Sequence, residues 1–339
     1  MQRGAVRLVL VNTIQIVGAG PAGSAAALAA LGEGSAVHIV DRARATRHKV
    51  CGEFLAAEAC HQLEALGVWQ AFLGCEPSRI RRAELHFGSR VKRWNLPETA
   101  FGLSRRALDG LLLERAVSRG AAVSRGVSWP GGEVHGRMVL ACGRRSTSSR
   151  KPRLFGFKAH FEGPVNDAVE LYFAGASYAG VSAVENNFTN VCGIAPEDEL
   201  RKAGFEIDEF LARSAPLAER LRPLTRRMEW LTTGPLNFSR LTAPFANAYP
   251  AGDALGFVDP FTGSGILNAL ATGRRAGRAA ARQSPVETYF RECRELLERP
   301  VAVSALFRTM IRSGWAGLLA GLVPGRWMYR LTRVPRFLN

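Results

Sequence analysis

Glycines at fixed spacing mark the segment of this chain with the clearest chemistry. Gly18, Gly20 and Gly23 form a G-x-G-x-x-G pattern between an apolar run at 14–17 and a helix-forming run at 24–31. The first glycine of such a pattern allows a tight turn, the second lets the backbone approach a pyrophosphate, and the third lets helix pack against strand. The free N–H groups that begin the helix attract phosphate oxygens. The pattern therefore predicts a phosphate-binding turn.

A second apolar run, residues 36–40, ends in Asp41. An acid at that position is placed to accept the hydroxyls of an adenosine ribose. Strand, turn, helix, second strand and terminal acid together predict a βαβ unit over residues 12–41 that binds a dinucleotide. The alternative is a Gly-rich turn in an ordinary βαβ unit.

A later Gly- and Pro-rich segment follows a short predicted strand near residue 250 and enters a predicted helix at 264–282. An acid at the strand end can bind ribityl hydroxyls, and the helix N-terminus can direct N–H groups at the flavin edge that becomes negative on reduction. The residues that carry this pattern are Gly252, Asp253, Pro260, Gly263, Gly265 and Ile266. The segment favours FAD, the alternative being a loop before a buried helix.

Two further segments complete a family likeness. Residues 48–55, HKVCGEFL, are similar to a K-x-C-G segment, and residues 103–109, LSRRALD, to an S-R-x-x-L-D helix start. With these motifs the chain resembles the FAD-dependent oxidoreductases of the geranylgeranyl reductase family. That family lies within the larger group that also holds p-hydroxybenzoate hydroxylase and the flavin-dependent halogenases. The likeness covers about residues 12–282, and the Cys51–Gly52 pair points to the reductase branch.

The resemblance implies an α/β fold, in which a Rossmann-like FAD-binding domain carries an inserted antiparallel β-sheet substrate domain and a C-terminal helical segment. The expected FAD-binding domain is discontinuous and takes residues 1–80, 101–153 and 249–292. The expected substrate domain takes 81–100 and 154–248, and the helical segment takes 293–339.

The resemblance also implies which residues hold FAD. The ADP half would bind Gly18, Gly20, Pro21, Ala22, Gly23, Asp41 and Arg42. Arg105 would approach the FAD phosphates or the ribityl chain, and the later segment from Gly252 to Ile266 would hold the ribityl chain and the isoalloxazine. One departure is that Cys142-Gly143 stands where the group usually has Asp-Gly.

Cys51 is the predicted catalytic residue, because a thiol near the flavin is a workable general acid. The alternative is a small packing residue, the commoner fate of a free cysteine. Residues predicted at the substrate pocket are His48, Lys49, Gly52 and Tyr178. Glu53 could pair with His48 or Lys49, although solvated surface charges and a packed strand tyrosine are the plainer interpretations.

Composition limits the class of partner. The net charge is +16 and the basic residues are almost all Arg, which favours an anionic membrane surface or phosphate-bearing ligands. We expect no nucleic acid, because no nucleic-acid-binding motif is present and the Arg residues are scattered. Six cysteines show no metal-ligand spacing, so no metal is expected, and free thiols indicate a reducing cytoplasm. No long apolar run predicts a membrane-spanning helix.

The C-terminal segment has an amphipathic pattern. Apolar residues from Val303 to Leu322 recur at three- and four-residue steps, Arg308 and Arg312 are expected on the opposite face, and no acid follows Glu298. Such a helix suits an anionic lipid interface, with the protein peripheral at the inner face of the membrane. The alternative is a helix whose apolar face packs on the substrate domain.

The leading interpretation is a FAD-dependent oxidoreductase that reduces C=C bonds of a prenyl or polyene lipid by hydride transfer from reduced flavin. One alternative is a flavin monooxygenase acting on an aromatic or polyketide-like compound, and another is a non-catalytic flavin- or nucleotide-binding protein at membranes. The absence of a halogenase W-x-W-x-I-P pattern disfavours halogenation. NAD(P)H or a ferredoxin could supply electrons, and the sequence leaves the oligomeric state open.

Overall fold

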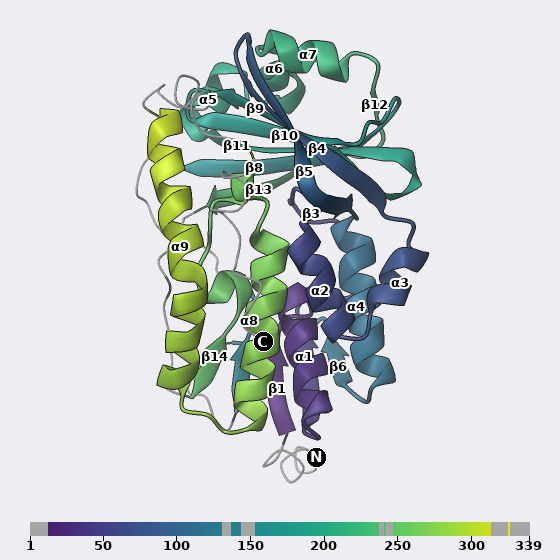
Figure 1. Cartoon of the computed structure of the whole chain (residues 1–339), viewed down its shortest axis with the longest axis vertical. Helices are drawn as coiled ribbons and strands as arrows, with labels where there is room; N and C mark the ends of the chain where they lie inside the picture. Colours follow the sequence, from purple (N-terminus) through teal and green to yellow (C-terminus); the bar gives the residue numbers. More distant parts are fainter. Residues whose placement is uncertain are drawn as a thin grey trace, which may run out of the picture.

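The computed structural model describes residues 13–130, 137–143, 153–236 and 247–312, together with the single residues 241 and 325. Within these residues the chain forms two β-sheets with helices packed around them. Figure 1 shows a parallel sheet with its helices in the lower half of the molecule and a second sheet in the upper half.

The lower sheet is parallel throughout, in the order β14-β7-β1-β2-β6. Its strands are β1 (Thr13–Val17), β2 (Ala36–Asp41), β6 (Ala122–Arg125), β7 (Met138–Leu140) and β14 (Ala248–Pro250). The central strands are short apolar runs because both faces of the sheet are buried. Ile14 and Ile16 pack with the helices on one face, and Val17 and Val40 pack with Trp129 on the other. β1, the helix after it and β2 form the βαβ unit that the sequence predicts.

Five helices pack on this sheet or on one another in the same half of the molecule. They are α1 (Pro21–Gly32), α2 (Ala57–Ala65), α3 (Trp69–Gly74), α4 (Arg105–Ser118) and α8 (Gly265–Ala281). The predicted helix over 105–119 is confirmed as α4, which begins where the Ser104 side chain accepts the Ala107 N–H at 3.2 Å.

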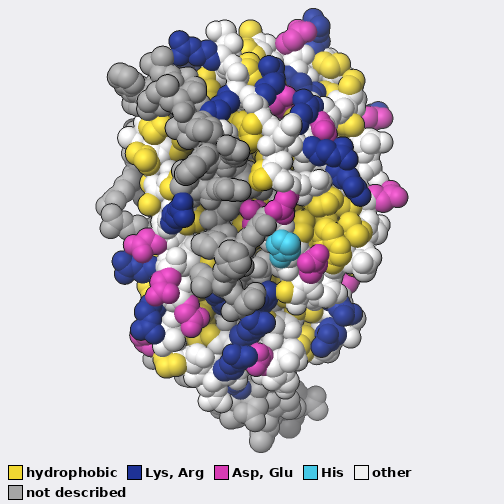
Figure 2. Space-filling model, viewed as in Figure 1, with side chains coloured by type: hydrophobic (Ala, Val, Ile, Leu, Met, Phe, Trp, Pro, Cys, Tyr) yellow, Lys and Arg dark blue, Asp and Glu magenta, His cyan; other side chains and the backbone are white. Residues whose placement is uncertain are grey.

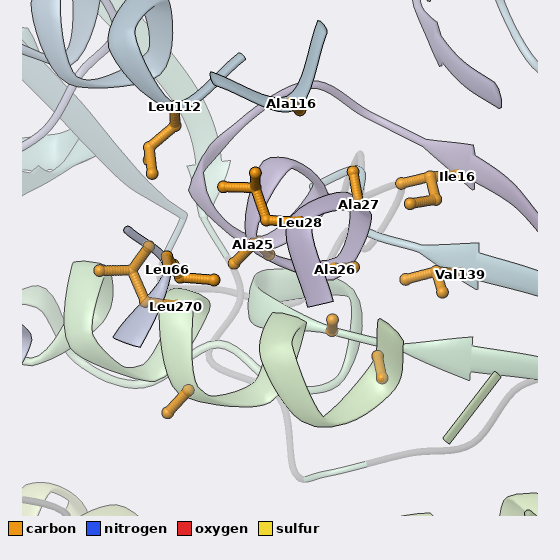
Figure 3. Close-up of a cluster of buried hydrophobic side chains, with 14 of the residues drawn as sticks. Ile16, Ala25, Ala26, Ala27, Leu28, Leu66, Leu112, Ala116, Val139 and Leu270 are labelled. Atoms are coloured by element: carbon orange, nitrogen blue, oxygen red, sulfur yellow. The ribbon is translucent and has the colours of Figure 1, made fainter. Parts of the chain in front are cut away.

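Helices α1 and α8 pack backbone to backbone. Ala269, Gly273 and Gly277 recur every four residues and so share one face of α8. A Cβ at Gly273 would lie 2.2 Å from the carbonyl oxygen of Ala22, and one at Gly277 would lie 2.1 Å from that of Ala26. Figure 3 shows the two helices side by side over a core that includes Ile16, Val139 and Leu270.

The upper sheet has nine strands in the order β12-β8-β11-β10-β9-β4-β5-β3, with β13 also paired to β8. They are β3 (Phe54–Leu55), β4 (Ser78–Phe87), β5 (Arg90–Gly102), β8 (Leu154–Glu162), β9 (Ala168–Ala174), β10 (Ser177–Ala183), β11 (Phe188–Pro196), β12 (Thr225–Arg226) and β13 (Leu231–Leu236). All pairs are antiparallel except β4–β9. The chain visits the lower half between β4 and β9, so no hairpin fixes their relative direction.

Helices α5 (Glu197–Lys202), α6 (Ile207–Ala212) and α7 (Ala215–Leu221) cover the top of this sheet (Figure 1). The single helix predicted from about Asp208 to Leu221 is therefore two helices. The break falls at Ser214, whose backbone is extended, because Pro216 lacks an N–H and cannot continue the helix before it. Short 3₁₀ turns η1 (Glu185–Asn187), η2 (Gly252–Ala254) and η3 (Pro260–Thr262) complete the described elements.

The last described helix, α9 (Val286–Arg312), runs along both halves of the molecule (Figure 1). The predicted domain boundary at residue 293 falls inside it, and most of the predicted C-terminal segment, 313–324 and 326–339, lies outside the described residues. Among the described helices, none combines the length and hydropathy of a membrane span. The predicted fold class, a Rossmann-like domain with a second sheet and a C-terminal helix, is confirmed.

We predict that Gly277→Ala destabilises the protein and Gly110→Ala does not. The Gly277 methyl would collide with the α1 backbone, and such overpacking costs about 1–3 kcal/mol. A Cβ at Gly110, inside α4, meets nothing within 4 Å, so alanine there should add up to about 1 kcal/mol through helix propensity. Urea unfolding of both variants measures the difference, and equal stabilities would contradict the close contact.

Candidate functional site

The Gly-rich turn between β1 and α1 requires glycine, because a side chain would not fit at two of its positions. Gly18 has a φ of +106°, and a Cβ there would lie 2.9 Å from the carbonyl oxygen of Ala141. A Cβ at Gly23 would lie 1.7 Å from the carbonyl oxygen of Gly18. Gly20 precedes α1 without any side chain to cap it, so the first N–H groups of the helix have no side-chain acceptor. This turn can present them to an anion.

Two cations lie over the turn. Arg105 Nη2 and Lys49 Nζ are 3.6 and 3.9 Å from the position a Cβ would take at Gly20. Asp109 holds both: its oxygens accept from Arg105 at 2.8 and 3.0 Å and from Lys49 at 2.7 Å. Burial alone would raise the pKa of Asp109, but Arg105 and Lys49 outweigh it and lower that pKa. Asp109 is thus an ionised anchor, which the sequence signalled through its i,i+4 spacing from Arg105.

Asp41 closes the other side of the turn. Its carboxylate, at the end of β2, accepts from the Ala19 N–H at 2.6 Å and from the Ala43 N–H at 2.7 Å. These bonds fix the acid beside the Gly-rich backbone and leave lone pairs for a ligand. Arg42, the next residue, is exposed, whereas Ala22 is buried against the face of α8.

The second Gly- and Pro-rich segment lies next to this turn because α8 packs on α1. Gly252, at φ +57°, donates its N–H to Thr272 Oγ1 at 2.9 Å. Asp253 is exposed only to a cavity that lies within the protein. The surrounding protein raises the pKa of its carboxyl group, and the positive charge of Arg105 offsets part of this effect. Gly263, in the left-handed region at φ +64°, turns the chain into α8, and a Cβ at Gly265 would meet open space.

A cavity of about 430 Å³ extends from this segment across the upper sheet to α9. Its inner end, next to the start of α8, is formed by Cys51, Gly52, Asp253 and the stretch 260–266 except Ser264. Its walls are almost wholly apolar, and the larger side chains that line it are Trp94, Leu171, Phe173, Tyr178, Phe261 and Phe307. Such a cavity suits a hydrophobic ligand with few polar groups.

Cys51 sits where three cationic or polar groups meet. Its Sγ accepts the Glu53 N–H at 3.4 Å, and the positive charge of Arg105 acts on it. Asn190 Nδ2 donates to the Cys51 carbonyl oxygen at 3.1 Å. The thiol is therefore held between the cations of the Gly-rich turn and the cavity.

The residues predicted at the substrate pocket separate into two groups. Gly52 and Tyr178 line the cavity, whereas His48 and Lys49 do not. Lys49 lies instead over Gly20, and His48 packs edge-on against His160 with 5.0 Å between ring centroids. Val50 is the first residue of this segment that lines the cavity, and the two basic residues before it contact other partners.

Tyr178 lines the cavity, and its hydroxyl group is bound to a buried acid. Its hydroxyl donates to Asp259 Oδ1 at 3.2 Å, and Arg308 of α9 forms an ion pair with the other oxygen of Asp259. Arg308, predicted on the helix face opposite the apolar residues, thus reaches a buried acid with its guanidinium group. Periodicity reports which positions are apolar, and it cannot show a buried acid on another segment.

Sequence reasoning missed two buried residues behind Cys51. Lys158 is fully buried and His160 is 7% exposed, and both contact the buried carboxylate of Glu53. A polar residue at alternate positions of a strand resembles an ordinary exposed face, so no local signal identifies them.

Comparison with known proteins agrees with this geometry. Residues 11–153 match the FAD binding domain family. The chain is 28% identical over 312 residues to a menaquinone reductase of Mycolicibacterium smegmatis, covering 78% of this chain and 75% of the relative. These observations decide the enzyme class. The chain is a FAD-dependent oxidoreductase.

Two further likenesses are narrower. This oxidoreductase is 37% identical over 113 residues to digeranylgeranylglycerophospholipid reductase 2 of Methanopyrus kandleri, covering 32% of this chain and 27% of that one. The structure of the flavin-dependent brominase Bmp2 superposes with a TM-score of 0.78 at 18% identity, covering 94% of this chain and 92% of the other. At that identity the brominase shares the fold.

We predict that Asp109→Asn destabilises the enzyme by about 3 kcal/mol at neutral pH. This is the lower end of the cost of breaking a buried ion pair, because Lys49 keeps part of its hydration. The folded-state pKa of Asp109 is lowered, so its contribution is complete above the unfolded value of about 3.9 and is lost as pH falls through the folded value.

Urea unfolding from neutral to acid pH tests this, because the gap between wild type and variant should shrink as the solution becomes acidic. Glu219→Gln, which removes an exposed i,i+3 pair with Arg222, serves as the control and should change stability by less than about 1 kcal/mol. A gap that stays constant with pH would contradict an ionised Asp109.

Proposed function

We propose that this FAD-dependent oxidoreductase reduces C=C bonds of a prenyl or polyene lipid by hydride transfer from reduced flavin. The observation that carries the proposal is the apolar cavity, which leads from the Gly252–Ile266 segment to α9. The part of the cavity beyond that segment is lined by apolar side chains and suits a section of a prenyl chain. The names of the relatives support the same substrate class, since menaquinone is a prenylated quinone and a digeranylgeranyl lipid carries prenyl chains.

The Gly-rich turn fits the ADP half of FAD. Gly20 has no side chain, so its backbone would admit a close pyrophosphate, and Arg105 and Lys49 above it supply positive charge. We assign Gly18, Gly20, Pro21, Gly23, Asp41, Arg42 and Arg105 to this half. Ala22 would act through its packing under the turn rather than through a polar contact.

The second segment fits the flavin half. Asp253 is open to the cavity at the end of β14, and α8 begins beside it without a side-chain cap. We assign Gly252, Asp253, Pro260, Gly263, Gly265 and Ile266 to the ribityl chain and ring. FAD bound there supplies the hydride, and the N-terminus of α8 would favour negative charge on the ring.

Cys51 would supply the proton that accompanies the hydride. It lines the inner end of the cavity, and Arg105 beside it would stabilise the thiolate left after proton transfer. The apolar walls would exclude water, so that the reacting carbons meet only the flavin and the thiol. NAD(P)H visiting the flavin or a ferredoxin would reduce FAD, because the described residues include no second Gly-rich βαβ unit.

The rival activity is hydroxylation of an aromatic compound by reduced flavin and oxygen. The fold serves both chemistries, so the solved structures of related fold do not favour either. The fully apolar character of most of the cavity wall favours a prenyl chain over a polar aromatic acid, which would need buried charged partners.

A single-turnover experiment separates these activities. Enzyme reduced without oxygen is mixed with menaquinone, then exposed to air so that the quinone ring returns to its oxidised form, and the product mass is measured. We expect a gain of two hydrogen atoms in the prenyl chain. Cys51→Ala should slow this step by about 100-fold or more, whereas Cys75→Ala, at a cysteine outside the cavity, should not. Unchanged menaquinone, or a gain of one oxygen atom in an aerobic reaction, would overturn the proposal.

We also propose that the substrate enters from an anionic membrane surface at α9. Leu306 lines the cavity and is nevertheless 63% exposed, so an apolar side chain stands at its mouth. The net charge of +16 would attract anionic lipid. Figure 2 shows basic side chains spread over the visible face rather than collected in a stripe, which is a poor arrangement for nucleic acid.

We predict that Leu306→Glu weakens binding to phosphatidylglycerol vesicles. A charged side chain at the mouth would have to leave water, which opposes insertion of this surface into lipid. Flotation of the FAD-loaded enzyme with vesicles measures the effect. Val117→Glu, at a valine of α4 that is 50% exposed, is the matched control and should bind as wild type does. Equal losses in both variants would indicate a general charge effect and contradict a docking surface at α9.

A further inference from the structure

A buried polar cluster lies behind Cys51, on one face of the upper sheet. Strands β8 and β11 pair so that Lys158 is opposite Cys192 and His160 is opposite Asn190. Because alternate residues of a strand share a face, all four side chains point the same way. Glu53, whose side chain is completely buried, meets this face from the Cys51–Gly52 segment.

Glu53 is the centre of the cluster. One carboxylate oxygen accepts from Lys158 and from the backbone N–H of Arg105 at 2.6 Å, and the other lies 2.7 Å from His160 Nε2. Burial would raise the pKa of Glu53, but His160 and Lys158 outweigh it and lower that pKa. An ionised carboxylate only accepts hydrogen bonds, so His160 carries its proton on Nε2.

His48 connects the cluster to the surface. It is half-buried, and one ligand atom each of His48, Glu53 and His160 lie within 4.8 Å of one another. This limit leaves room for one bridging water beside His48, whose Nδ1 is buried without a hydrogen-bond partner among the described residues. Burial, followed by the charges of Lys158, His160 and Arg106, lowers the pKa of His48 despite Glu53, so the ring is neutral near pH 7 and can both accept and donate.

The same three side chains have the types and spacing of a metal site. Lys158 argues against a metal ion, because its ammonium group is fully buried and bonds to the carboxylate that a cation would need. A divalent ion would add positive charge beside a buried ammonium in a region of low dielectric. Two imidazoles around a buried carboxylate suit proton transfer instead.

We propose that His48, His160 and the Glu53–Lys158 pair pass protons from solvent to Cys51, an inference that rests on the proposed reductase function. Each reduced C=C bond takes two electrons and one hydrogen as hydride from reduced flavin, and one proton from the Cys51 thiol. The thiolate regains its proton from the cluster, and the cluster is refilled from solvent through His48. Cys192 lies opposite Lys158, and its Sγ is 3.8 Å from the position that a Cβ would take at Gly52, next to Cys51.

His160→Gln tests the route, because glutamine can donate the same hydrogen bond to Glu53 but cannot carry a proton onward. We expect product formation in a single turnover to slow by about 100-fold, with a larger solvent deuterium isotope effect and unchanged KM, melting temperature and flavin content. His86→Gln is the control, since His86 is an equally buried histidine on β4 that stacks on Tyr172 and does not line the cavity.

A His160→Gln enzyme with the wild-type rate and isotope effect would overturn the proposal. So would a stoichiometric metal ion in the purified enzyme that is lost in this variant, since the cluster would then be a metal site. A wild-type enzyme that reduces no prenyl chain would instead overturn the proposed function, and the next measurement tests the cluster without any substrate.

That measurement is the pH dependence of Cys51 alkylation by iodoacetamide, followed by peptide mass spectrometry. Removing the negative charge in Glu53→Gln should favour the thiolate and lower the midpoint by about one pH unit, while Glu84→Gln, at a buried acid of β4, should leave it unchanged. Arg105 and Cys192 also interact with the thiol, and these substitutions leave both side chains in place. Equal midpoints in all three proteins would show that Cys51 and the cluster are not coupled.

Where Glu53→Gln does not fold, the double variant Glu53→Gln with Lys158→Met removes both charges. The midpoint of its alkylation should return to that of wild type.

Discussion

The backbone contact between α1 and α8 is the constraint on which both halves of the site depend. Glycines at 273 and 277 bring the carbonyl oxygens of α1 to distances that no Cβ tolerates. The two helices consequently run parallel, and α8 begins about two turns, or about 12 Å, beyond the start of α1, although about 240 residues separate them in the chain. One helix begins at the pyrophosphate turn and the other at the proposed flavin segment, so a single packing choice sets the length of the ligand that the pair can hold.

Charge is distributed around this contact in a way that keeps the cavity itself apolar. Three buried acids each form ion pairs with neighbouring basic residues. Asp109 binds Lys49 and Arg105 at the turn. Glu53 binds Lys158 and His160 behind Cys51, and Asp259 binds Arg308 at α9. Each buried acid has its cation, which avoids the large cost of an unpaired interior charge. The cavity lies between these three clusters of paired charges and exposes little polar surface to a hydrophobic substrate.

Local signals were enough to predict the parts of this molecule that are built locally. The G-x-G-x-x-G turn, the Asp41 position, helix α4 and the segment before α8 each follow from spacing within about fifteen residues. The cluster around Glu53 could not be predicted, because it depends on the register between β8 and β11 and on where β3 places the preceding loop. His48 and Lys49 are adjacent in sequence but face different partners for the same reason. The Arg308–Asp259 pair joins segments about fifty residues apart, which helical periodicity does not report.

Helix α9 contributes a wall to the cavity through one face only, with Val303, Leu306, Phe307 and Met310. None of these four side chains belongs to the turn, the acids or the glycines that the proposed FAD site requires. Exchanging them alters the width and depth of the cavity while the nucleotide half keeps its packing. Substitutions on this one face of α9 can therefore adapt such an enzyme to longer, shorter or more branched substrates. The variants on the way would keep the residues that hold their cofactor.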